Sequence, residues 1–187
     1  MASEVLVEKT KLKKLPLTVH LLGDKVLRQS AKRVARVDDS IRQLIREMLQ
    51  TMYGSDGIGL AAPQVAVQKQ VIVLDCTPDK PENPPLILIN PTIKKYSRDL
   101  CVDQEGCLSI PEVFLDVKRP KAIEVAYKDE QGRPKKLKAS GLLARVIQHE
   151  MDHLSGVLFV DRVENALVLT QELTKQGFSH QAVRPVA

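Results

Sequence analysis

Two histidines and a glutamate near the C-terminal end of the chain have the types and spacing of a catalytic metal site. His149 and His153 are four positions apart, and Glu150 directly follows the first of them, in an HExxH pattern. On a helix, positions i and i+4 lie on one face, one turn apart. The two imidazoles could therefore bind one divalent metal ion, with Glu150 beside them to take a proton.

The flanking residues predict the helix that this spacing requires. Ser140 is a suitable N-cap residue, and Gly156 suits the C-terminal end. On a helical wheel the two histidines share a side with Leu142 and Val146. The polar residues collect on the opposite side, at Arg145, Gln148 and Asp152. Glu150 lies between apolar neighbours, where a carboxylate needs a partner that a metal and its water would supply. The alternative is a charged surface helix that holds two histidines by chance.

Length and composition indicate a single globular domain. The 187 residues can bury one core, and a hydrophobic content of 43% is ordinary. No apolar run approaches the roughly 18 residues that span a bilayer, and no hydrophobic segment of a secretory signal follows the N-terminus. The odd number of cysteines, three, indicates a reducing, cytoplasmic setting rather than a disulfide framework.

Positive charge is concentrated near the N-terminus. The net charge is +5, and residues 1–36 hold nine of the 28 Lys and Arg residues but only three of the 23 Asp and Glu residues. Such a segment could contact RNA or another anionic surface, although a solvated tail is the simpler alternative. We expect a flexible basic arm over residues 1–15, one catalytic domain over 16–177 and a polar tail over 178–187.

Apolar periodicity predicts an α+β domain. Helical spacing predicts an amphipathic helix over residues 40–53 and a C-terminal helix over 163–176. Aliphatic or alternating runs predict strands, the last two forming a hairpin, over residues 71–75, 86–90, 91–97, 122–128 and 135–138. We therefore expect mixed or antiparallel strands packed around the central HExxH helix, not a doubly wound sheet.

The third metal ligand has two candidates. Glu172 lies 19 residues after His153, a spacing that suits a thermolysin-like zinc peptidase. Cys107 offers a thiolate, which binds divalent metals tightly. A non-catalytic RNA-binding module with a structural zinc is a further alternative, but structural sites usually have four protein ligands. We also predict that Glu105 pairs with Arg119, because a charge so close to a metal site needs compensation.

Three segments resemble, in order, the signature motifs of peptide deformylases. They are residues 57–64 (GIGLAAPQ), 105–109 (EGCLS) and 148–153 (QHEMDH). The resemblance covers residues from about 16 to 165. It implies removal of the N-formyl group from the initiating formyl-methionine of new polypeptides, with release of formate. It also implies one divalent metal ion, ferrous iron (Fe2+) in the cell, with zinc (Zn2+), nickel (Ni2+) or cobalt (Co2+) able to occupy the site.

The resemblance also implies roles for individual residues. The metal ligands would be Cys107, His149 and His153. Glu150 would be the general base and acid, while the side-chain amide of Gln64 and the backbone N–H of Leu108 would face the developing oxyanion. The methionine pocket would be lined in part by Ile58, Gly59, Leu142 and Val146.

The implied partners are formyl-methionyl nascent peptides, with transient contact to the ribosome and with neither membrane nor DNA. Three positions depart from the pattern, and two of them, Val26 for a common proline and Ala66 for a common glycine, concern packing only. Many bacterial members carry an arginine seven residues after the metal cysteine, and this chain has Phe114 there. This position concerns the way in which the substrate chain beyond methionine is held.

Overall fold

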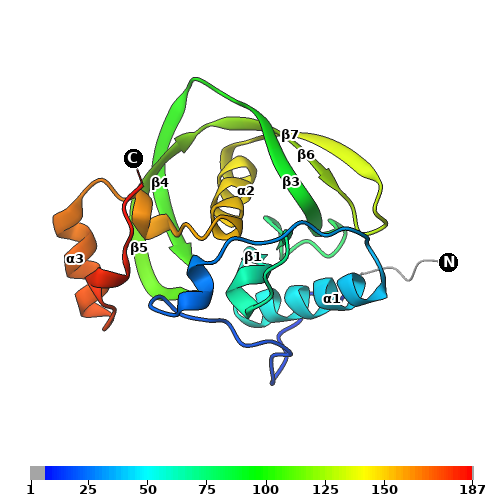
Figure 1. The fold of residues 1–187 in the computed structure, drawn as a ribbon, viewed down its shortest axis with the longest axis horizontal. Helices are drawn as coiled ribbons and strands as arrows, with labels where there is room; N and C mark the ends of the chain where they lie inside the picture. Colours follow the sequence, from blue (N-terminus) through cyan, green and yellow to red (C-terminus); the bar gives the residue numbers. More distant parts are fainter. Residues whose placement is uncertain (1–6, 187) are drawn as a thin grey trace.

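The computed structural model describes residues 7–186 and arranges them as two antiparallel sheets around one helix (Figure 1). The α-helices of this part of the chain are α1 (Asp39–Gly54), α2 (Gly141–Leu154) and α3 (Ala166–Lys175). Its strands are β1 (Gly59–Ala61), β2 (Val71–Leu74), β3 (Leu86–Tyr96), β4 (Leu100–Cys107), β5 (Ile110–Pro120), β6 (Ala122–Lys128) and β7 (Pro134–Ser140). Short 3-10 helices cover Lys25–Arg28, Ala62–Val65, Phe159–Arg162 and His180–Ala182. The expected α+β class is confirmed.

The larger sheet has the strand order β1-β2-β3-β6-β7, with every neighbouring pair antiparallel. Residues 91–97 continue the strand of residues 86–90, as expected: both belong to β3, whose first half pairs with β2 and whose second half pairs with β6. At the join, Asn90 has a φ of 53° and the register shifts. Its side chain stabilises this bend, because it bonds both the N–H and the carbonyl of Val34 at 2.8 Å.

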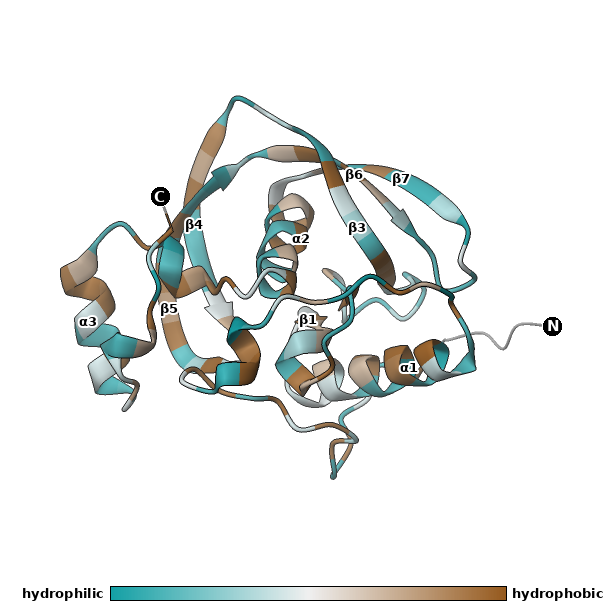
Figure 2. Ribbon diagram, in the orientation of Figure 1, coloured by the Kyte–Doolittle hydropathy of each residue, from teal (hydrophilic) through white to brown (hydrophobic). Residues whose placement is uncertain are grey.

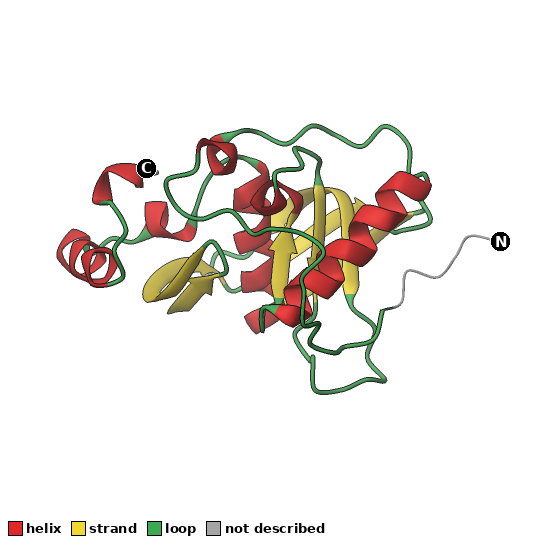
Figure 3. Ribbon diagram, turned by 90° about the horizontal axis from the view of Figure 1, so that it is seen from below, coloured by secondary structure: helices red, strands yellow, loops and turns green. Residues whose placement is uncertain are grey.

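Helix α1 covers one face of this sheet (Figure 3). Asp38 caps its start by accepting a hydrogen bond from the N–H of Ile41 at 3.1 Å. Its apolar stripe includes Ile45, Met48 and Met52, which pack against alternate residues of the strands, as the predicted amphipathic pattern requires. Figure 2 shows the brown apolar and teal polar bands of this helix.

Helix α2 covers the opposite face. In β2, Val71 and Val73 face α1, whereas Ile72 and Leu74 pack with the apolar side of α2. Strand β2 is therefore apolar throughout, because both of its faces are buried. This arrangement places the HExxH helix at the centre of the molecule.

The strands β4 and β5 form a separate two-stranded sheet on the other side of α2 (Figure 3). The inward-facing residues of β5 pack with α3 and the segment after α2, and the core residues there include Val113, Leu115, Val117, Phe159 and Leu173. The segment after α2 completes this core, since Leu158, Phe159 and Val160 are buried. Helix α2 is thus enclosed between the larger sheet and this hairpin.

Both terminal segments contact the domain. Within the expected flexible arm, the ammonium group of Lys9 lies 2.7 Å from Asp75 and donates to the carbonyls of Lys80 and Asn83. Residues 1–6 lie outside the described residues. Within the expected polar tail, the N–H of Arg184 donates to Asp161 at 2.7 Å. Across residues 7–186, no helix has the length and apolar character needed to cross a membrane.

Candidate active site

The HExxH segment is helical, as its flanks predict. Helix α2 presents His149 and His153 to the interior, with 8% and 1% of their surfaces exposed. Ser140 occupies the N-cap position, although its side chain makes no capping hydrogen bond. After the helix, Gly156 has a φ of 73°, and a Cβ there would lie 2.7 Å from the backbone oxygen of Arg28. Only glycine fits this turn, which fixes the C-terminal end of α2.

Cys107 lies with the two histidines, at the end of β4. Its Sγ is 3.4 Å from Nε2 of His153, and one ligand atom from each of the three residues lies within 4.8 Å of the others. The register between β4 and β5 shifts just before Cys107, which turns the thiol toward α2. The rival candidate, Glu172, lies on α3 and faces Lys175 at 3.7 Å. The structure therefore brings Cys107, not Glu172, to the HExxH histidines.

The donor set and its surroundings fit a divalent metal ion. One thiolate and two imidazoles suit a tetrahedral metal with one position left for water or substrate. Glu150 is 4% exposed, and its Oε2 has no hydrogen-bond partner among residues 7–186. Burial raises the pKa of Glu150 to about 7. A buried carboxylate oxygen without a protein partner leaves room for a water next to the three ligands.

The pKa values of the two histidines are shifted in opposite directions. Desolvation lowers the pKa of His149, but hydrogen bonds with Cys107 and Glu105 outweigh it and raise that pKa well above its ordinary value. Burial, followed by the charge of His149, lowers the pKa of His153 well below its ordinary value. Imidazole binds metals in its neutral form, so protons and a metal ion would compete for these side chains.

A cavity of about 550 Å³ opens over this cluster. Nine of the ten site residues expected from the sequence line it, namely Ile58, Gly59, Gln64, Cys107, Leu108, Leu142, Val146, His149 and Glu150. His153, the tenth, is buried beneath them. Gly59 is required by close packing, because a Cβ at that position would collide with Oε1 of Glu150.

Gln64 is fixed in one orientation. Its Oε1 accepts a hydrogen bond from the N–H of Ala61 at 2.9 Å. Its Nε2 lies 3.1 Å from the hydroxyl of Ser109 and 3.4 Å from Sγ of Cys107. The amide N–H groups of Gln64 therefore face the metal-ligand cluster and can donate a hydrogen bond there.

Comparison with known proteins identifies the family. Residues 16–167 match the family model described as polypeptide deformylase. A peptide deformylase of Microchaete diplosiphon is 70% identical over the full length of both chains, and peptide deformylase 1 of a Nostoc species is 71% identical over the same extent. The chain belongs to the peptide deformylase family.

Solved deformylase structures agree with this fold. The crystal structure of the Synechococcus elongatus enzyme, in complex with actinonin, has a TM-score of 0.95 and 65% identity, covering 96% of this chain and 98% of that one. The Thermotoga maritima enzyme has a TM-score of 0.75 and 41% identity, covering 79% and 97%. Peptide deformylases are metalloenzymes that hydrolyse the N-formyl amide of nascent polypeptides and release formate, and this is the function of the chain.

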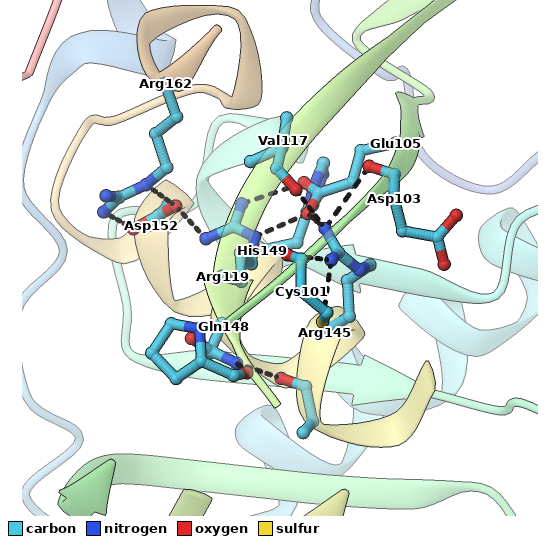
Figure 4. Close-up of polar contacts among 12 residues, drawn as sticks. Cys101, Asp103, Glu105, Val117, Arg119, Arg145, Gln148, His149, Asp152 and Arg162 are labelled. Atoms are coloured by element: carbon cyan, nitrogen blue, oxygen red, sulfur yellow. Dashed lines mark hydrogen bonds and ion pairs between the residues drawn. The ribbon is translucent and has the colours of Figure 1, made fainter. Parts of the chain in front are cut away.

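The deformylase site is supported by a buried ion-pair network centred on Glu105 (Figure 4). The Glu105 carboxylate accepts hydrogen bonds from Nε and Nη2 of Arg119 at 2.5 and 2.8 Å, which confirms the predicted pair. It also pairs with Nη1 of Arg145 at 2.7 Å and with Nδ1 of His149 at 2.9 Å. Desolvation opposes its ionisation, but the hydrogen bonds and charges of Arg119 and His149 hold the pKa of Glu105 well below its ordinary value. The hydrogen bond between Glu105 and Nδ1 orients the ring of His149.

Sequence reasoning missed two residues of this network. Arg145 also donates to the carbonyls of Cys101 and Val117, which joins α2 to both strands of the β4–β5 hairpin. Asp152 accepts hydrogen bonds from Arg119 at 2.8 Å and from Arg162 at 2.6 Å. One feature of the sequence could have revealed them. Arg145, Gln148 and Asp152 lie on one side of a central helix, which indicates that this side faces a polar surface of the protein.

Proposed function

We propose that Cys107, His149 and His153 hold the catalytic metal of this deformylase. The observation that carries the proposal is their convergence on the floor of the one cavity that also contains Glu150 and Gln64. We propose ferrous iron as the metal in the cell, with zinc, nickel or cobalt able to replace it. When bound, such a metal supplies a Lewis acid that polarises the formyl oxygen and lowers the pKa of water.

Glu150 is proposed as the group that moves the proton. Its buried carboxylate lies beside the three ligands and has an oxygen without a protein partner. It would take the proton of the attacking water and deliver it to the nitrogen of the departing amine. Gly59 supports this role, because the missing side chain leaves the carboxylate space to face the substrate.

Gln64 and Leu108 are proposed to stabilise the oxyanion. The N–H of Ala61 fixes the amide of Gln64 so that its Nε2 faces the cluster. Leu108 directly follows Cys107 and lines the same cavity, so its backbone N–H could donate to the same oxygen. Donors that are fixed before the reaction need no reorganisation as the negative charge develops.

The apolar part of the cavity is proposed to hold the methionine side chain. Ile58, Gly59, Leu142 and Val146 line it from β1 and α2. An unbranched thioether suits such a pocket, because it adapts to irregular apolar space. A charged side chain at the first position would lose its hydration there.

The test is formate release from formyl-Met-Ala. We expect a chelator to abolish it and ferrous iron, added without oxygen, to restore it with one ion per chain. Formate release that persists in a chain shown to be free of metal would contradict the proposal.

We further propose action in the cytoplasm, with transient ribosome contact. Salt-sensitive co-sedimentation with ribosomes would test that contact, and its absence at low salt would contradict it.

A further inference from the structure

The outer face of the β4–β5 hairpin carries exposed apolar side chains. Val102 on β4 and Phe114 on β5 are 59% and 57% exposed, and Leu100 is 52% exposed. On the inner face, Glu105 and Val117 are buried. Side chains of a strand alternate between its faces, so β4 turns Glu105 inward and Val102 toward solvent, while the outer face of β5 carries Phe114 beside the charged Asp116 and Lys118. Such a reversal indicates that the outer face binds something.

A second cavity of about 300 Å³ lies between the hairpin and the start of α3. Its apolar lining residues are Val102, Phe114, Leu115, Val163 and Val168. Lys118 on β5 and Glu164 before α3 form an ion pair at 2.7 Å, which joins the two walls. The groove therefore has an apolar part and a polar part, the latter formed by Gln104, Asp116, Lys118, Glu164 and Asn165.

Phe114 and Gln104 line both cavities. A Cβ on Gly106 would lie 2.5 Å from Cε1 of Phe114, so the missing side chain lets the ring lie against β4. The ring is thus the shared wall between the candidate active site and the groove. A peptide that leaves the active site on this side passes over an aromatic surface.

We propose that this groove is a subsite for the nascent chain beyond formyl-methionine and that it takes apolar side chains. The proposal rests on the active site assigned above. From Gly106 to Val102 the strand rises by about 13 Å, at about 3.3 Å per residue, a span that an extended peptide covers with about four residues. The side chains at positions four and five of the substrate are the ones that reach Val102 and Val168.

Continuity favours the substrate as the occupant. Every substrate longer than the active-site cavity must leave it, and the wall of Phe114 leads into this groove. Lys118 and Glu164 neutralise each other, whereas Asp116 adds a negative charge that disfavours acidic substrate residues. For apolar substrate residues, the source of affinity is the removal of apolar surface from water against the five apolar lining residues.

The experiment compares two formylated peptides that differ only at positions four and five, formyl-Met-Ala-Ser-Leu-Leu and formyl-Met-Ala-Ser-Ser-Ser. We expect kcat/KM to be about three- to tenfold higher for the leucine peptide, through a lower KM, as burial of part of two leucines would give. The double variant Val102→Ser, Val168→Ser should bring this ratio close to one. Its turnover of formyl-Met-Ala should stay unchanged, since that peptide ends before the groove.

Leu167→Ser is the matched control. Leu167 lies on the same helix as Val168 and is 69% exposed, but it lines neither cavity. This variant should keep the preference for the leucine peptide. A change equal to that of the double variant would attribute the effect to surface hydrophobicity in general and would overturn the subsite.

Three further results would overturn the proposal. Equal kcat/KM for the two peptides, with normal formyl-Met-Ala turnover, would overturn the subsite and leave the active site intact. Sedimentation that shows a dimer in the wild type and a monomer in the double variant, with the peptide preference unchanged, would make the groove an interface between two copies. No formate release from formyl-Met-Ala would contradict the active site and the subsite together.

Discussion

Glu105 and Arg119 form a buried bidentate ion pair across the β4–β5 hairpin, with both side chains 4% exposed. Arg119 bonds Asp152 of α2 with its remaining nitrogen, at 2.8 Å. The pair therefore connects the strand that ends in Cys107 to the helix that carries the histidines. Its effect on the metal site is mechanical as well as electrostatic.

Replacement of Arg119 should destabilise the protein and the site together. We expect Arg119→Ala to lower the free energy of unfolding by about 3–5 kcal/mol, because it removes the bidentate partner of the buried Glu105 carboxylate and one of the two arginine partners of Asp152. Urea denaturation of the two proteins measures this difference. Lys118→Ala is the control: its ion pair with Glu164 is exposed, so a change of at most about 1 kcal/mol is expected. Equal effects of the two variants would contradict the role of the buried network.

Glu150→Gln should separate metal binding from turnover. The amide keeps the size of the side chain and removes its ability to accept and return a proton. We expect one metal per chain, as in the wild type, and at least about a hundredfold loss of kcat on formyl-Met-Ala. Metal analysis and formate release on the same sample measure both quantities. A metal-loaded variant with wild-type turnover would rule out the proposed role of Glu150.

The third ligand is tested by a pair of variants. Cys107→Ser should weaken metal binding and abolish most deformylation, because a serine hydroxyl stays protonated near neutral pH whereas a coordinating thiol is deprotonated. Glu172→Ala should be nearly neutral, since Glu172 is far from the cluster and contacts Lys175. Loss of metal in Glu172→Ala, with full metal in Cys107→Ser, would reverse the assignment.

Lys9 should contribute stability although it belongs to the N-terminal arm. Its ammonium group lies against Asp75, with 10% and 2% of the side chains exposed. We expect Lys9→Met to lower the free energy of unfolding by about 2–4 kcal/mol. Lys13→Met, at an exposed position, should have little effect. Deletion of residues 1–15 should lower the melting temperature while leaving formyl-Met-Ala turnover intact at low temperature, and an inactive but folded truncation would contradict this.

The Lys9–Asp75 ion pair should make the free energy of unfolding depend on pH. Burial raises the pKa of Asp75, but hydrogen bonds from Lys9, Thr77 and Tyr53 outweigh it and hold the pKa below its ordinary value of about 3.9. A carboxyl with a lowered folded-state pKa stabilises the protein fully above its unfolded-state pKa and loses this contribution as the pH falls through the folded-state pKa. The wild type should therefore lose more stability than Lys9→Met between about pH 5 and pH 3, as acid denaturation curves would show.

The elements that could be predicted from the sequence are those whose apolar residues recur with the period of the element and are buried on one face. Helix α1 and the β6–β7 hairpin lie where the pattern placed them, because each buries one apolar face. Helix α2 was predicted from contiguous residues and its caps. Strand β3 continues through Pro91, as expected, because the proline lies at a register shift, where a missing N–H is tolerated.

Strand β4 was missed for a physical reason. It buries Glu105 and exposes Leu100 and Val102, the reverse of the usual pattern, so its residues do not read as a half-buried strand. Arg145 was missed in the same way. A buried arginine is stable only with partners, and the partners of Arg145 come from residues 28 to 44 positions away. No local pattern reports such contacts.

Cys107 ends strand β4 of the two-stranded sheet, whereas the histidines lie on α2, so the three metal ligands come from different layers of the fold. A metal ion bound to all three residues would therefore act as a cross-link between separately formed parts of the fold. Its contribution to stability would grow with the logarithm of the free metal concentration. Oxidation of the Cys107 thiol would break this cross-link. Loss of activity and loosening of the hairpin would then be a single event.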